Sequence, residues 1–188
     1  MTIDYPLLRT FQVSDSIVEF LNKKIEEYKD SHESSNEITE FSNYRWNSGF
    51  QSGNLLNWED EEYREFLDNQ ILELISNHLS IPKSNLTYAW NNILEYIDGG
   101  KMGPHNHCHN EDFVIFIYLS TCNSGDTVFY LNNYDQNSIK RTTINIRPQK
   151  NKAAIFSSII FHEGKFTDEN KKIFVAGVKI NSEGYDYN

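Results

Sequence analysis

Apolar side chains in the first 85 residues recur at the spacing of amphipathic helices. They repeat at intervals of three and four over residues 14–31 and again over residues 58–79, where acidic residues near the start suit the helix dipole. The polar stretch of residues 30–40 and the aromatic, Ser- and Gly-containing segment of residues 44–52 are predicted to be loops. Pro82 ends the helical region. The pattern therefore predicts two helices, each with one apolar face that needs a partner.

From residue 86 onward the pattern changes to that of strands. Aromatic and β-branched residues cluster in short runs separated by Gly, Asn, Asp and Pro, and many such strands in succession are typical of a sandwich or barrel. Because the helices need a sheet to pack on, we expect a single domain over residues 1–188, with residues 1–85 as a helical support region and residues 86–188 as the β core. The runs that predict strands are residues 88–96, 113–119, 127–131, 142–146, 153–156 and 173–180.

Composition limits the kinds of partner. The chain has 27 acidic against 17 basic residues and a net charge of -10, which argues against a surface that follows nucleic-acid phosphates. No apolar run is long enough to span a bilayer, and the N-terminus lacks a basic start followed by an apolar run. Two cysteines, Cys108 and Cys122, are too few for a disulfide framework. We expect a soluble, cytoplasmic protein that binds neither nucleic acid nor membrane; its oligomeric state stays open, a homodimer included.

Histidines are concentrated in one short segment that follows a glycine-rich turn. In an extended strand alternate side chains share a face, so His105 and His107 would point the same way and could hold one metal ion. His109 continues that face. An isolated His-x-His pair more often belongs to a surface loop that binds nothing specific, so the neighbouring sequence has to decide.

Three segments around these histidines occur in a familiar order. Residues 96–105 contain a tyrosine, a glycine turn and a Pro-His pair. Residues 118–129 contain Tyr-Leu-Ser and then Gly-Asp-Thr-Val-Phe, and residues 146–162 contain Ile-Arg-Pro and then Phe-Ser-Ser ahead of His162. This succession resembles the prolyl-hydroxylase-like Fe(II)/2-oxoglutarate dioxygenases, in which such segments lead into the metal site and present its distal histidine.

A narrower resemblance covers nearly the whole chain. A Trp-Gln-Ser type loop at residues 42–52, the helix from about residue 58, the Trp-Asn-Asn run at 90–92 and the two histidine segments resemble a bacterial and phage subgroup of 2-oxoglutarate and Fe(II) oxygenases. The resemblance implies a double-stranded β-helix, or jelly roll, of about eight strands with two helices packed outside. It also implies a dioxygenase that uses Fe(II), 2-oxoglutarate and O2 to hydroxylate a small molecule or a protein side chain.

The resemblance implies metal ligands at His105 and His162, and the chain departs from the family at the third ligand. The family's usual pair is His-x-Asp or His-x-Glu, whereas His107 stands at the carboxylate position. We expect His105, His107 and His162 to bind Fe(II), in a site one unit more positive than usual. A shifted register is the alternative, in which His109 and Glu111 form the pair.

The second departure concerns the cosubstrate. The family usually places an arginine about ten residues after the distal histidine, where it forms a fork with the far carboxylate of 2-oxoglutarate. Here that region contains two lysines, and the resemblance assigns the role to Lys172, with Tyr96 as a hydrogen-bond partner for the same carboxylate. Lysine cannot reproduce the two-pronged geometry of arginine, so weaker binding or another keto acid is compatible with this site.

Another barrel family resembles part of the same segment. Gly99, the His-x-His pair and Glu111 match most of the first motif of the cupins, which bind metal through three histidines and a glutamate and need no keto acid. However, Tyr118 stands where the glycine that closes that motif belongs, and the second motif lacks its Pro-x-Gly before His162. A cupin-like dioxygenase or isomerase therefore remains an alternative.

A third alternative is a metal-binding or regulatory module without catalysis, suggested by the missing carboxylate and arginine.

Large aromatic residues could line a substrate pocket, but they more often pack between helices and sheet. We therefore expect the following residues in the core: Trp46, Phe50, Trp58 and Trp90.

Overall fold

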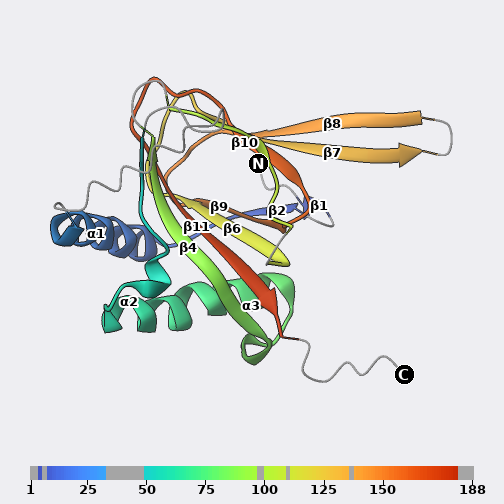
Figure 1. Ribbon diagram of the computed structural model, residues 1–188. Coiled ribbons are helices and arrows are strands. Elements are labelled where there is room, and N and C mark those ends of the chain that lie inside the picture. The colour runs from blue at the N-terminus through green and yellow to red at the C-terminus, as the bar shows by residue number, and fades with distance from the viewer. Residues whose placement is uncertain are drawn as a thin grey trace, which may run out of the picture.

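Two antiparallel β-sheets form the centre of the molecule (Figure 1). The computed structural model describes residues 4–5, 8–32, 49–96, 100–108, 111–135 and 138–181. The strands are β1 (Asp4–Tyr5), β2 (Leu8–Gln12), β3 (Gly49–Gln51), β4 (Leu86–Tyr96), β5 (Met102–His105), β6 (Phe113–Tyr118), β7 (Thr127–Asp135), β8 (Ser138–Ile146), β9 (Lys152–Ser157), β10 (Phe161–Gly164) and β11 (Lys171–Ile180). The helical segments are α1 (Asp15–His32), η1 (Leu55–Asn57), α2 (Glu61–Phe66), the π-helical η2 (Leu67–Leu72), α3 (Glu73–Leu79) and η3 (Lys83–Asn85).

The strand order is that of a jelly roll. The large sheet has the order β1-β2-β9-β6-β11-β4-β3 and the small sheet has the order β5-β10-β7-β8. From β4 to β11 the chain moves back and forth between the sheets, apart from the β7–β8 hairpin, which stays in the small sheet and extends beyond it (Figure 1). Each sheet therefore receives four of these eight strands. The predicted double-stranded β-helix is confirmed.

Three strands from the first part of the chain enlarge the large sheet. β2 pairs with β9, β1 pairs with β2, and β3 pairs with β4. The sequence predicted only helices and loops there, because runs of two to five residues are too short to show a clear alternation. β10 was also not predicted as a separate strand. The six predicted strands are all present, most of them longer than expected.

The helices cover the outer face of the large sheet (Figure 1). α1 buries Ile17, Leu21 and Ile25 in a core that also contains Ile93 of β4 and Phe174 of β11. The two predicted helices are thus present, and they bury their apolar faces as expected. Residues 30–32 belong to α1 and not to a loop, while residues 33–48 lie outside the described part of the chain.

The second helical stretch begins later than predicted. Its N-terminal cap is Asp60, whose carboxylate accepts a hydrogen bond from the Tyr63 amide at 2.8 Å. It ends at Leu79, after which Ser80 takes a left-handed conformation (φ 58°). Trp58 precedes this helix and packs against the core, as expected.

A separate apolar core fills the space between the two sheets. Phe129, Phe156 and Tyr118 are its largest fully buried members. Because β4 and β11 lie between the two cores, both of their faces are buried. In the described residues no helix is both long and apolar enough to cross a membrane.

Candidate metal centre

The three predicted histidine ligands come together inside the small sheet. His105 ends the edge strand β5 and is paired directly with His162 on β10, so that their rings lie side by side. His107 follows just after β5, where its amide donates to the Ser158 carbonyl at 2.9 Å. One ring nitrogen of each histidine lies within 4.8 Å of the others. The arrangement can hold one metal ion on three imidazoles.

Backbone hydrogen bonds set the orientation of two of these rings. His105 Nδ1 lies 2.8 Å from the Gly103 carbonyl, and His162 Nδ1 lies 3.1 Å from the Ile160 carbonyl. A carbonyl accepts only, so Nδ1 carries the proton in each ring and donates it. The lone pair of Nε2 is then free in both residues, which is the tautomer that a metal ligand needs.

Burial keeps two of the imidazoles neutral. Burial, and to a lesser extent the neighbouring His105, lowers the pKa of His107 to about 4. Burial, followed by the neighbouring His105 and His107, holds the pKa of His162 well below its usual value. Neutral rings can bind a metal at neutral pH without first losing a proton.

Of the alternative ligand pair, His109 and Glu111, the structure describes only Glu111. His109 lies outside the described residues. Glu111 is not a member of the group of three, although its Oε1 lies 3.4 Å from His107 Nδ1 and its side chain is almost completely buried. The geometry therefore favours His107 over Glu111 as the third ligand.

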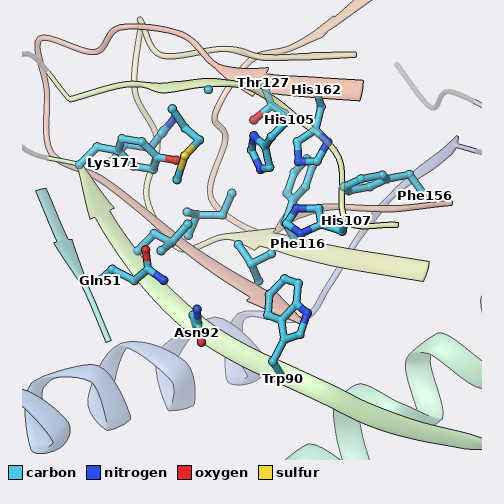
Figure 2. A pocket seen from close by; sticks show the side chains of 16 residues that line it. Gln51, Trp90, Asn92, His105, His107, Phe116, Thr127, Phe156, His162 and Lys171 are labelled. Atoms are coloured by element: carbon cyan, nitrogen blue, oxygen red, sulfur yellow. The ribbon is translucent and has the colours of Figure 1, made fainter. Parts of the chain in front are cut away.

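A cavity of about 260 Å³ opens in front of the histidines. In Figure 2 the three rings gather on one side of it, Lys171 projects from another, and Gln51, Asn92 and Trp90 face them across the space. The side chains come from both sheets. Trp90 packs against the core between the sheets, as expected, and also lines the cavity. Trp46 and the side chain of Phe50 lie outside the described part.

The lysine in the cavity is Lys171 and not Lys172. Alternate residues of β11 face opposite ways, and the cavity face carries Lys171, Ile173 and Val175. Lys172 points to the helix layer, where its Nζ lies 2.8 Å from Glu26 Oε1 and 3.6 Å from Glu95 Oε1. Lys172, to which the sequence analysis assigned the keto acid, is therefore not among the residues that line the cavity.

Lys171 is a buried cation at the wall of the cavity. Its side chain is about 1% exposed, its Nζ donates to the Gly125 carbonyl at 2.8 Å, and it lies 4.0 Å from the centre of the Tyr96 ring. Burial lowers the pKa of Lys171 to about 8. Within the described residues its hydrogen-bond partner is a carbonyl, so the ammonium retains donors for an anion.

Two residues with hydroxyl groups also line the cavity. Tyr96, predicted as a cosubstrate contact, is buried and lines the cavity. Thr127, which the sequence did not single out, also lines it, and its Oγ1 accepts a hydrogen bond from Tyr118 at 2.6 Å. Its own hydrogen is then available to the cavity. Thr127 could have been suspected from its place in the Gly-Asp-Thr-Val-Phe run.

Gln51 and Asn92 were also missed as cavity residues. They carry the polar groups of the cavity wall that faces the histidines. Asn92 lies on the same face of β4 as Trp90 and Tyr96, two and four residues away, and this alternation was the available signal. For Gln51 the sequence held no comparable signal, because β3 is only three residues long.

Comparisons with known proteins find this fold among oxygenases. No protein-family model and no curated protein sequence matches the chain. A prolyl-4-hydroxylase from Pseudomonas putida superposes with a TM-score of 0.65 at 13% identity, over 92% of each chain. A prolyl hydroxylase from Trichoplax adhaerens, in complex with a hypoxia inducible factor peptide fragment, gives 0.62 at 14% identity over 94% of this chain and 84% of that one.

A third similar structure is the epimerase SnoN in complex with Fe3+, alpha ketoglutarate and nogalamycin RO. It gives a TM-score of 0.64 at 11% identity, over 92% of this chain and 78% of that one. Such low identities establish the fold and leave the chemistry to the site. The chain has the double-stranded β-helix fold of the prolyl hydroxylases and the 2-oxoglutarate–Fe(II) oxygenases.

Proposed function

We propose that this protein is an Fe(II)- and 2-oxoglutarate-dependent oxygenase that hydroxylates, or otherwise oxidises by two electrons, a small molecule or a protein side chain. The observation that carries the proposal is one cavity that joins a cluster of three histidines to a buried lysine. The histidines suit a metal and the lysine suits a carboxylate. A keto acid needs both at once.

The donor set fits iron. Three imidazoles leave coordination positions open for a keto acid and O2, as in other non-haem iron oxygenases. His105 and His162 present Nε2, because their Nδ1 atoms are held by carbonyls. When bound, iron together with 2-oxoglutarate and O2 supplies the oxidising chemistry, and the protein supplies placement and exclusion of water.

Lys171 would bind the far carboxylate of 2-oxoglutarate. A buried ammonium is costly without an anionic partner, and a carboxylate satisfies it with a charge-assisted hydrogen bond. Thr127, which also lines the cavity, would donate a hydrogen bond to the keto acid, and Tyr96 holds the lysine side chain under its ring. A keto acid held in this way would lie between Lys171 and the three histidines.

The remaining wall would receive the substrate. Apart from Lys171 and the histidines, the described side chains that line the cavity carry no charge. Gln51 and Asn92 offer amide donors and acceptors, and Trp90 offers an apolar surface whose ring centre lies 5.2 Å from that of His107. An uncharged substrate group that can form hydrogen bonds suits this wall.

The similar structures support this assignment. One of them was solved with Fe3+ and alpha ketoglutarate, and another with a peptide. The cupin alternative would make Glu111 a ligand, but its carboxylate lies outside the group of three. It also leaves the buried Lys171 without a role.

An anaerobic titration separates the three alternatives. Fe(II) is added to the metal-free protein, followed by 2-oxoglutarate, and absorption is recorded in the visible range. The proposal predicts a charge-transfer band that appears only with both additions and is absent when Zn(II) replaces Fe(II). Iron that binds without any response to 2-oxoglutarate would favour the cupin-like alternative. Absence of metal binding would favour a non-catalytic module.

A further inference from the structure

Glu111 contacts one metal-binding histidine from outside the metal site. Its Oε1 lies 3.4 Å from His107 Nδ1, and its side chain is only 5% exposed. We infer that Glu111 is a positioning residue that holds His107 through Nδ1, directs Nε2 to the metal, and supplies the negative charge that the missing carboxylate ligand would have supplied. This inference rests on the proposed metal site.

The placement of the carboxylate argues against the simpler role of a fourth ligand. The metal-binding nitrogens of the three histidines form one group, and the carboxylate of Glu111 does not belong to it. Since Glu111 approaches Nδ1 of His107, the other ring nitrogen remains for the metal. An imidazole that binds a metal through one nitrogen carries its proton on the other, and a carboxylate beside Nδ1 favours the tautomer with that proton on Nδ1.

The backbone on both sides of Glu111 is fixed. The Ser158 carbonyl accepts from the His107 amide at 2.9 Å, and the Ser158 amide donates to the Asp112 carbonyl at 3.0 Å. Asp112 is held further, because its amide donates to the Val178 carbonyl and its carboxylate accepts from the Ile180 amide, at 2.9 and 2.8 Å. Ser158, in the β9–β10 turn, therefore bridges the backbones of His107 and Asp112 and so restricts the position of Glu111 between them.

His107 differs from the other two ligands in the partner of its Nδ1. His105 and His162 donate to neutral carbonyls, whereas His107 faces a carboxylate. A carboxylate at this position increases the basicity of the imidazole, so His107 donates more electron density to a metal than the other two rings do. Three neutral imidazoles and Glu111 have the same total charge as two imidazoles and one carboxylate ligand. Glu111, which lies behind His107, thereby supplies the negative charge that is missing at position 107.

Metal affinity tests this inference with a matched control. The protein is titrated with Co(II) and, without oxygen, with Fe(II). Glu111→Gln keeps the size of the side chain and removes its charge, and it should weaken binding about 10- to 100-fold. Glu163→Gln is the control, because Glu163 adjoins His162 in the sequence but contacts Tyr130 and Lys165 instead of a ligand. It should leave the affinity within about twofold of the wild type.

A double-mutant cycle shows whether Glu111 acts through His107. In the His107→Ala background the further change Glu111→Gln should have no additional effect on affinity. At saturating Co(II) the visible absorption bands of Glu111→Gln should also shift, which loss of fold stability alone would not produce.

Three outcomes would overturn the inference. Equal affinities for Glu111→Gln and Glu163→Gln would remove the role of the charge, and an undiminished effect in the His107→Ala background would remove the coupling. A larger loss of metal for Glu111→Ala than for His107→Ala would make Glu111 a ligand. Failure of the wild-type protein to bind metal would instead contradict the proposed function.

Discussion

Replacement of Lys171 by methionine removes the charge that we assign to the keto acid and nearly preserves the length of the side chain. A hydrogen bond to a charged group contributes about 1.5–3 kcal/mol, which corresponds to about a 10- to 150-fold change in a dissociation constant. Lys171 is fully buried, so solvent does not screen this interaction. We therefore expect Lys171→Met to weaken 2-oxoglutarate binding by a factor in this range while iron affinity stays unchanged.

The neighbouring lysine provides the matched control. Lys172 lies on the opposite face of β11 and pairs with Glu26 and Glu95, so Lys172→Met should leave keto-acid affinity unchanged. The assay is an anaerobic titration of the iron-loaded protein with 2-oxoglutarate, followed by the charge-transfer band. A loss confined to Lys172→Met, with Lys171→Met behaving as wild type, would refute the assignment and restore the sequence-based one.

Three further predictions concern pH and stability. The pKa of Lys171 is about 8 in the free protein, so the lysine loses its charge above pH 8. The affinity for 2-oxoglutarate should therefore be constant below pH 8 and fall by up to about tenfold per pH unit above it. A constant affinity from pH 7 to 9.5 would contradict this. Gly177→Ala should destabilise the fold by about 1–3 kcal/mol in urea unfolding, because the new Cβ would lie 2.6 Å from the Trp90 indole; an unchanged midpoint would show that the ring moves freely. Tyr63→Phe should lower the free energy of unfolding by about 1–3 kcal/mol, because the buried Tyr63 hydroxyl donates to Asn91 Oδ1 at 2.6 Å. It should leave metal affinity unchanged, and a loss of metal binding would contradict the separation of the two cores.

Local pattern was sufficient for most of the secondary structure and for two of the three histidines. The helical stripes and the short apolar runs were visible in the sequence, and His105 and His107 were recognisable by their alternate spacing. His162 required the resemblance, because its proximity to His105 is created by the pairing of β10 with β5, more than fifty residues apart in the chain. Sequence spacing alone does not report such a pairing.

The face of β11 could not be predicted. In a half-buried strand apolar and polar residues alternate, but β11 is covered by helices on one side and by the second sheet on the other. Phe174 and Ile173 are therefore both buried, and the sequence offers no alternation by which to separate Lys171 from Lys172. A shift of one residue placed the expected cation on the wrong side of the sheet.

Glu111 illustrates a second limit. Its carboxylate was recognisable as a candidate from the His-x-Glu spacing, yet its distance from the metal depends on how the loop is held by Ser158 and Asp112. A sequence shows which ligand types are close along the chain. It does not show which of two candidates coordinates the metal and which supports a ligand.

Formation of succinate tests the central claim most directly. The protein is incubated with Fe(II), 2-oxoglutarate and O2, and succinate is measured against a metal-free control and against His162→Ala, which removes the ligand common to every metal-binding interpretation. We predict succinate from the wild-type protein, and neither iron binding nor succinate from His162→Ala. Wild-type protein that binds iron stoichiometrically but forms no succinate above the metal-free control would contradict the account.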